Sequence, residues 1–238
     1  MSAAAYVKNY PTPQLAEIAR AHHEWLLRLE APVRVPQLRE VTGTRMALER
    51  LEGHHPRPDD LPVVAAALGA LHTVANIRYL HAGRLDRPFE ATPTLTIGDF
   101  TSPRVSVLPQ DFEINGLPCA LYKDSNIRNF ILTDDHVGII DFDDLTLAPF
   151  GYDLAKLVVS TAMTHGHLSH ALIENALDRY NSETTRIPNA HCDLGRLQLY
   201  ADIHHHLTSR YLGRHGYAHQ WPAVHPWPRG STTQRELP

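Results

Sequence analysis

Three oxygen-bearing side chains in the middle of the chain have the types and spacing that phosphoryl transfer requires. Asp124 and Asn129 are five residues apart on a predicted loop, and Asp141 follows an apolar stretch that predicts a buried strand. Such a transfer needs a carboxylate to orient the attacking hydroxyl and accept its proton, and oxygen ligands that hold Mg²⁺ on the phosphates. A hairpin between the two segments would return Asp141 to the loop, so the three side chains can serve one metal ion.

This segment resembles the catalytic core of aminoglycoside phosphotransferases and their choline-kinase and protein-kinase relatives. That family's pattern is His-Gly-Asp-x-x-x-x-Asn, a hairpin, Ile-Asp-Phe-Asp/Glu and a Tyr-Asp-Leu-Ala run. Four pieces of this chain follow in the same order: Asp124, Asn129, the run Ile140–Asp143 and the run Tyr152–Ala155. By this resemblance Asp124 would be the catalytic base, and Asn129 and Asp141 would bind magnesium. Asp153 would support the catalytic loop, and the implied cofactors are ATP and Mg²⁺.

The resemblance extends less closely to the N-terminal third. Lys8, on a predicted strand before a helix, resembles the lysine that pairs with the α- and β-phosphates of the nucleotide. Its partner would be a glutamate on the following helix. Glu17 and Glu24 are seven residues apart and share a helix face, so either would serve, and Glu17 is preferred. The alternative is an exposed Lys8 and ordinary solvated glutamates.

The segment Met46–Gly53 resembles the strand and hinge whose backbone meets the adenine, which would bring Glu49 and Leu51 to the nucleotide. Two departures from the family matter. Only seven residues precede Lys8, so we expect a shortened N-terminal lobe without the Gly-rich loop that covers the phosphates, and weaker ATP binding. Either this lobe is minimal, a partner completes it, or the true start of the chain lies upstream. The usual His-Gly before the catalytic Asp is Tyr-Lys here, and Lys123 would either neutralise developing phosphate charge or stabilise the charged form of its neighbour.

The predicted architecture is an α+β, protein-kinase-like fold with two lobes. Residues 1–52 would form the truncated N-terminal lobe, residues 53–220 the mostly helical catalytic lobe, and residues 221–238 a tail. Strands are predicted near 3–8, 37–41, 46–51, 117–122, 130–133 and 137–142. Helices are predicted over 13–29, 60–80, 152–164, 167–182 and 193–213. Residues 81–118 carry no signature that we can interpret.

The composition is that of an ordinary globular protein, with 43% hydrophobic and 20% charged residues. The net charge of −4 does not favour a nucleic-acid partner. We expect no membrane partner, because we read no apolar run as long enough to span a bilayer, and a cytoplasmic location is the default. The three consecutive histidines 204–206 point in different directions on a helix, so they are not expected to bind one metal ion.

The acceptor is expected to be a small hydroxylated molecule, with an aminoglycoside-like antibiotic or another hydroxylated amine as the first class. Acidic side chains that would meet such a cation are Asp143, Asp144, Glu174 and Asp178, although solvated surface acids are the plainer interpretation. A choline, sugar or amino-alcohol acceptor stays open. The alternative function is a non-catalytic, kinase-like binding protein, and a metal-dependent hydrolase is a remote third.

Overall fold

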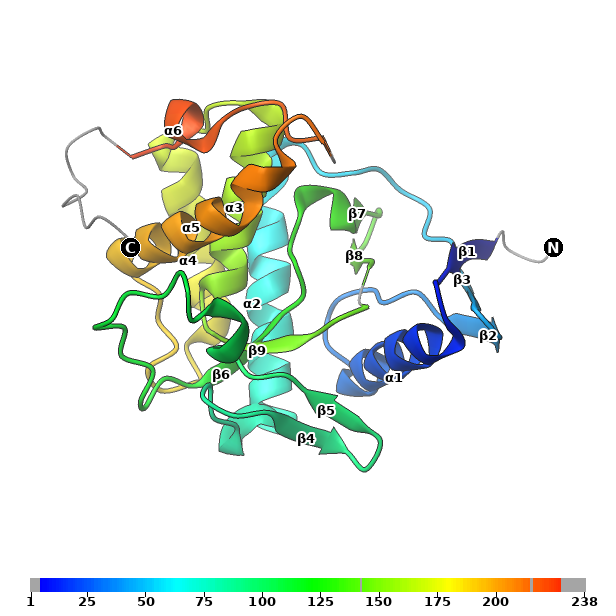
Figure 1. The fold of residues 1–238 in the computed structure, drawn as a ribbon. Coiled ribbons are helices and arrows are strands. Elements are labelled where there is room, and N and C mark those ends of the chain that lie inside the picture. The colour runs from blue at the N-terminus through cyan, green and yellow to red at the C-terminus, as the bar shows by residue number, and fades with distance from the viewer. Residues whose placement is uncertain (1–4, 142, 215, 228–238) are drawn as a thin grey trace.

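The fold was analysed in a computed structural model that describes residues 5–141, 143–214 and 216–227. Phe142 of the Ile-Asp-Phe-Asp run and residues 228–238 of the expected tail lie outside the described residues. Small sheets and long helices alternate along the chain, which confirms the α+β, kinase-like class. In Figure 1 the N-terminal strands and helix lie on one side, and the long helices gather on the other.

The N-terminal part consists of a three-stranded antiparallel sheet and one helix. Strand β3 (Arg45–Glu49) lies between β1 (Ala5–Asn9) and β2 (Leu38–Thr42). Helix α1 (Pro13–Leu29) begins as predicted, since the Thr12 hydroxyl accepts from the Leu15 N–H at 3.3 Å. These elements bury a small apolar cluster of their own, which includes Ala19 and Met46.

The larger part is built on four helices and buries the main core. They are α2 (Leu61–Arg78), α3 (Tyr152–His165), α4 (His170–Thr184) and α5 (Leu194–Thr208). A four-residue helix, α6 (Trp221–Val224), follows. Trp25, Leu26 and Leu29 of α1 also join this core, so the boundary near residue 52 stays a prediction.

Helix α2 requires a correction to the sequence analysis. Among the described residues, Pro58–Arg78 is long and apolar enough to cross a membrane by length and composition alone. However, 56% of the apolar window is buried inside the protein, and α2 packs along α4. A core helix passes the same test, because apolar residues on most sides suit either environment.

Two short antiparallel strand pairs frame the loop that carries Asp124 and Asn129. Strand β6 (Cys119–Tyr122) precedes the loop and pairs with β9 (Thr146–Pro149), which the sequence analysis did not predict. Strand β7 (Phe130–Leu132) follows it and pairs with β8 (Val137–Ile139). Strand β8 ends three residues earlier than predicted, so Asp141 lies beyond the strand and not in it. The uninterpreted segment contains another hairpin, β4 (Phe89–Thr92) with β5 (Leu95–Ile97).

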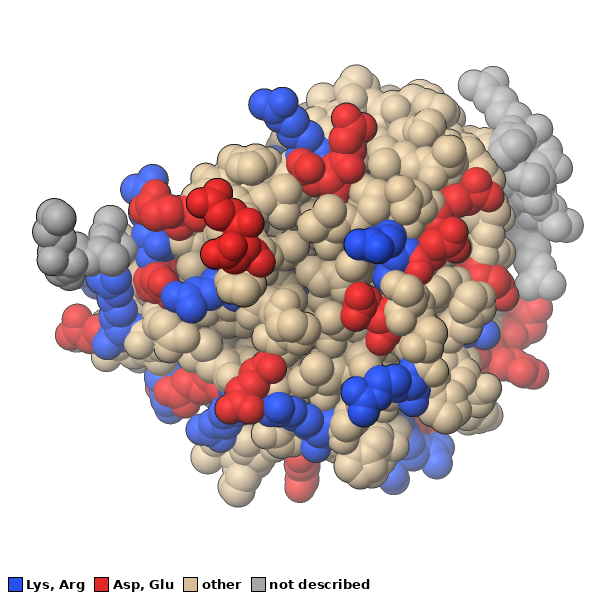
Figure 2. Space-filling model, turned by 180° about the vertical axis from the view of Figure 1, so that it is seen from behind, with Lys and Arg blue, Asp and Glu red and all other residues tan. Residues whose placement is uncertain are grey.

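The β7–β8 pair is tied to the N-terminal half of the chain by backbone hydrogen bonds. The Arg34 N–H donates to Val137 at 2.9 Å, and His54 and Leu132 exchange bonds of 3.1 and 2.8 Å. The segments before β2 and after β3 are therefore fixed to the hairpin that leads to Asp141. Seen from the side opposite to Figure 1, acidic and basic side chains are interspersed over the described surface (Figure 2).

We predict that Gly69→Ala destabilises the protein, because α2 and α4 touch at this glycine. An added Cβ would lie 2.7 Å from the Tyr180 carbonyl oxygen, so one helix must shift. The free energy of unfolding should fall by about 2 kcal/mol, measured by urea denaturation. The control is Gly195→Ala on α5, where the nearest atom would be 3.4 Å away, and stability should rise by up to about 1 kcal/mol. Equal effects at both glycines would contradict the close contact.

Candidate active site

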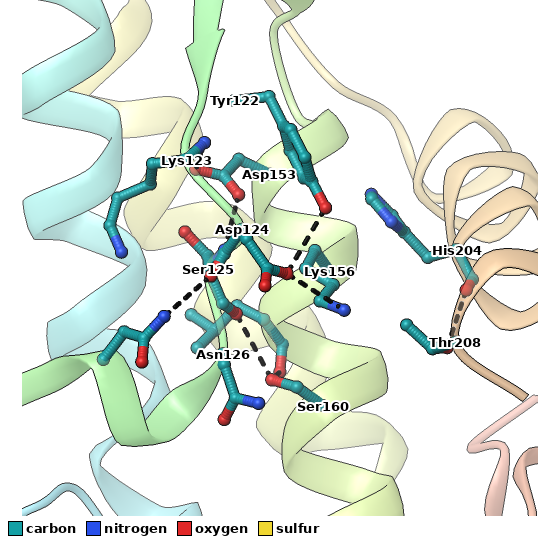
Figure 3. A network of polar contacts seen from close by, with 12 residues as sticks. Tyr122, Lys123, Asp124, Ser125, Asn126, Asp153, Lys156, Ser160, His204 and Thr208 are labelled. Carbon is teal, nitrogen blue, oxygen red and sulfur yellow. Dashed lines mark hydrogen bonds and ion pairs between the residues drawn. The ribbon is translucent and has the colours of Figure 1, made fainter. Parts of the chain in front are cut away.

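One buried carboxylate holds the loop between β6 and β7 in place. Asp153, in the first turn of α3, is completely buried and accepts the backbone N–H of Ser125 at 3.0 Å and that of Lys123 at 3.4 Å (Figure 3). Burial alone would raise the pKa of Asp153, but His72, the Lys123 charge and the Ser125 side chain together lower it. These bonds confirm the expected supporting role of Asp153, and buried His72, which bonds the Tyr180 hydroxyl, packs behind it.

Asp124 presents its carboxylate outward from this fixed loop. Its backbone is in the left-handed region at φ 63°, and its side chain is 59% exposed. One carboxylate oxygen receives the Tyr122 hydroxyl at 3.3 Å and lies 3.1 Å from the ammonium of Lys156. The sequence analysis missed Lys156, although it stands three residues after Asp153 on the same helix, a spacing that places both on neighbouring positions of one face.

Asn129 and Asp141 are brought together at the other end of the loop. The Asn129 amide NH₂ donates to the Asp124 carbonyl at 3.1 Å. The amide oxygen of Asn129 is not used in this bond, so it can accept a hydrogen bond or bind a cation. The Ile140 N–H donates to the Asn129 carbonyl at 2.9 Å and so fixes the segment next to Asp141. Asp141 also has a left-handed backbone, at φ 68°. Asp124 and Asp141 thus both have left-handed backbones, a costly conformation that is typical of functional loops.

Lys8 reaches across from the small sheet to the acids that follow β8. Its ammonium forms ion pairs with both Asp141 and Asp143, and the Tyr10 hydroxyl donates to Asp143 at 2.9 Å. Burial alone would lower the pKa of Lys8, but the bonds and charges of the two carboxylates outweigh it and raise that pKa. The predicted phosphate-binding lysine and the predicted metal ligand are therefore in direct contact.

A cavity of about 590 Å³ lies between the small sheet and the β7–β8 pair. Five of the predicted site residues line it: Lys8, Glu49, Leu51, Asn129 and Asp141. Its apolar walls include Ala19, Met46, Leu48, Ile131 and Ile140. The Glu49 carboxylate is occupied by Arg34 at 2.6 Å and by the Gln37 N–H at 3.0 Å. Apolar walls with a few polar groups suit a nucleotide, whose flat base would contact the walls and whose phosphates would meet the polar groups.

The structure does not bring Glu17 to this cavity. Glu17 pairs with Arg20 on the exposed side of α1, and Glu24 pairs with the same arginine at 2.5 Å. Neither glutamate is therefore the observed partner of Lys8, whose partners come from the segment after β8. Arg20 lies between the two glutamates along the helix and satisfies both locally.

Lys123 is buried away from the cavity lining. Its ammonium lies 4.9 Å from the centre of the Phe130 ring and 3.4 Å from the Ile140 carbonyl oxygen. Burial lowers the pKa of Lys123, although the charges of Asp153 and other nearby carboxylates act in the opposite sense. A direct contact between Lys123 and a nucleotide stays a prediction.

The acids expected to meet a cationic acceptor do not surround Asp124. Asp143 is engaged by Lys8, Glu174 pairs with His170 at 3.2 Å on α4, and Asp178 is exposed on the same helix. Of the three consecutive histidines, only His204 is buried, and its Nε2 bonds the Tyr152 carbonyl at 2.9 Å.

The residues present fit a magnesium ion bound together with nucleotide phosphates. Mg²⁺ in such sites takes one or two protein oxygens and fills its octahedron with phosphates and water. Asn129 and Asp141, which line one cavity, would supply those two oxygens. Among the described residues, no group of three or more His, Cys, Asp or Glu side chains gathers into an all-protein metal site.

Comparison with protein families agrees with this geometry. A model of the phosphotransferase enzyme family matches residues 3–200. No curated protein sequence matches the chain.

Solved structures share the fold at low sequence identity. The macrolide 2′-phosphotransferase of Brachybacterium faecium superposes with a TM-score of 0.56 at 14% identity, covering 94% of this chain and 86% of that one. The choline kinase of Streptococcus pneumoniae gives 0.58 at 15% identity, covering 88% and 76%. An aminoglycoside phosphotransferase of Streptomyces rimosus, solved with ADP and streptomycin, gives 0.51 at 18% identity, covering 84% and 85%. At these identities the likeness shows the fold.

We predict that Asp153→Asn destabilises the protein in a pH-dependent way. The folded-state pKa of Asp153 is lowered, so its stabilising contribution is present above the unfolded-state pKa of about 3.9 and is lost as pH falls through the folded value. At pH 7 the variant should lose about 2–3 kcal/mol of unfolding free energy, and the loss should shrink at pH 3.

The matched control is Asp178→Asn, at an exposed position of α4. Urea denaturation at both pH values should find it close to wild type. An equal loss of unfolding free energy at pH 3 and pH 7 for Asp153→Asn would contradict a stabilising role for the ionised Asp153 carboxylate.

Proposed function

We propose that this chain, which belongs to the phosphotransferase enzyme family, transfers the γ-phosphoryl group of Mg·ATP to a hydroxyl of a small molecule. The observation that carries the proposal is the convergence of three predicted groups. Asp124 and Asn129 share one hydrogen-bonded loop, and Asn129 and Asp141 line one cavity. Phosphoryl transfer depends on positioning and charge stabilisation, and this arrangement supplies both.

Asp124 is proposed to orient the acceptor hydroxyl and accept its proton. Its exposed carboxylate can be approached by an acceptor, while the bonds of Asp153 to the backbone on either side hold it still. The Tyr122 hydroxyl and the Lys156 ammonium fix one carboxylate oxygen. The second oxygen is then the one that can meet the hydroxyl.

The cavity beside Lys8 is proposed to hold the nucleotide. Leu51 and the apolar walls would contact the adenine, and Lys8 would contact the phosphates. Asn129 and Asp141 would hold Mg²⁺, which on binding would neutralise phosphate charge and polarise the transferring group. Because Lys8 now pairs with Asp141 and Asp143, its ammonium must exchange at least one carboxylate for a phosphate oxygen.

A second candidate function is nucleotide binding without transfer. The ion pairs of Lys8 favour it, because they engage a predicted magnesium ligand and no helix glutamate holds the lysine. Binding without turnover on any acceptor would identify this function. An aminoglycoside-like or other hydroxylated amine stays a prediction for the acceptor, as does a role in antibiotic resistance.

We predict that Asp141→Ala and Asp124→Ala separate binding from transfer. A ligand that binds the native state raises the melting temperature by mass action. Mg·ATP should raise that of wild type and Asp124→Ala but not that of Asp141→Ala. Magnesium-dependent formation of ADP from ATP, with water or an added acceptor taking the phosphoryl group, should disappear in both variants.

The control is Asp134→Ala in the exposed turn between β7 and β8, which should behave as wild type. Unchanged ADP formation by the Asp124→Ala variant would exclude Asp124 as the catalytic base. The absence of any shift in wild type at millimolar ATP would exclude the proposed nucleotide site.

A further inference from the structure

The surroundings of the Asp124 carboxylate are rich in positive charge. Lys156 has a side chain that is only 5% exposed, yet its ammonium emerges from α3 at the carboxylate that is proposed to take the acceptor proton. The pair is visible at the centre of Figure 3. Asp124 and Lys156 cancel as charges, so the base itself offers little attraction for a cationic acceptor.

A second cation, Arg128, lies in the same loop between the proposed base and the proposed metal ligand. The ring of Tyr217 is shared by the two cations, with the Lys156 ammonium 5.7 Å and the Arg128 guanidinium 5.6 Å from its centre. The Tyr217 hydroxyl accepts from the Asn126 amide at 3.0 Å, which fixes the ring against the loop. Both cations are therefore held on one aromatic side chain next to Asp124.

Arg128 is held in place without a carboxylate partner. Its Nε donates to the Asn126 amide oxygen at 3.3 Å, and within the described residues no carboxylate lies within 4.0 Å of its guanidinium. The guanidinium lies directly on Gly216, where an added Cβ would be 1.7 Å from Nη1. Gly216 has a φ of 79°, so the turn both needs a glycine and leaves room for the arginine.

The buried Asp153 carboxylate is engaged by the loop backbone, and the titratable group that Arg128 itself influences is a histidine. Burial, followed by the charges of Arg128 and His219, lowers the pKa of His165 at the end of α3. Two basic side chains, Arg128 and Lys156, thus pack on one tyrosine ring beside the exposed carboxylate of this loop. A guanidinium without a carboxylate binds a carboxylate or phosphate group through paired hydrogen bonds, whereas a polyamine would be repelled.

We propose that the acceptor carries an anionic group, a carboxylate or a phosphate, which binds Arg128 beside Lys156 while its hydroxyl faces Asp124. This rests on the proposed phosphotransferase function and replaces the hydroxylated amine with a hydroxylated acid as the acceptor class. Positive charge at this position would also stabilise the negative charge that accumulates when an anionic acceptor approaches the γ-phosphate.

The test compares four small probes with a shared three-carbon skeleton: D-glycerate, sn-glycerol 3-phosphate, glycerol and the amine serinol. Each is titrated by NMR into the full chain, alone and saturated with Mg²⁺ and AMP-PNP, with the Arg128 Nε–H signal as readout. At least one of the two anions should bind saturably, about tenfold more tightly than glycerol or serinol, as charge-assisted hydrogen bonds require. Comparing the anions shows whether carboxylate or phosphate is preferred.

Variants then assign the binding to Arg128. Arg128→Gln should weaken the anion about tenfold, Arg128→Lys should keep the preference for anions, and Arg128→Glu should reverse it towards serinol. Arg179→Gln, at an exposed position of α4, is the matched control and should change neither affinity. Melting temperatures check that each variant is folded.

Several results would overturn the inference. They are serinol binding as tightly as the anions, no saturation by either anion, or an anion affinity that Arg128→Gln leaves unchanged. Failure of Mg²⁺ and AMP-PNP to bind would count against the proposed function instead. Because the titrations are also run without nucleotide, the two failures are distinguishable.

Discussion

The bonds of one buried carboxylate position the rest of the site. Asp153 is completely buried, and its oxygens accept backbone N–H groups on both sides of Asp124. A buried carboxylate without such partners would cost several kcal/mol, so the loop and α3 must keep their relative position for the core to remain stable. The rigid helix thus fixes a strained loop, and the loop presents an exposed acid.

A second constraint joins this loop to the cavity. Backbone bonds tie the β7–β8 pair to Arg34 before β2 and to His54 after β3, and the chain after β8 brings Asp141 to Lys8. The cavity therefore has one wall from each half of the chain. Movement of the small sheet would change the distance between Lys8 and the acids, which would couple the proposed nucleotide binding to the arrangement of the proposed metal ligands.

Local and repetitive features were predictable from the sequence. The helix over 13–29 follows from Thr12, Pro13 and the apolar spacing. The motif order predicted one site for Asp124, Asn129 and Asp141, and Asn129 bonds the Asp124 carbonyl and lines one cavity with Asp141. What failed depends on contacts between distant segments. Glu17 was chosen as the partner of Lys8, but helical spacing cannot show that Arg20 satisfies it first. Lys156 became significant only when the fold placed it against Asp124, and β9 is defined only by its pairing with β6.

In the proposed site, Asn129 and Asp141 would hold a metal ion only together with nucleotide phosphates. The most direct measurement is an electron paramagnetic resonance titration in which Mn²⁺ replaces Mg²⁺, performed with and without ATP. Two protein oxygens are too few to hold the ion tightly alone, so protein without ATP should leave the free Mn²⁺ signal nearly unchanged. Protein added together with ATP should reduce that signal below the level that ATP alone gives. The same signal with and without protein, at every ATP concentration, would contradict the proposed site.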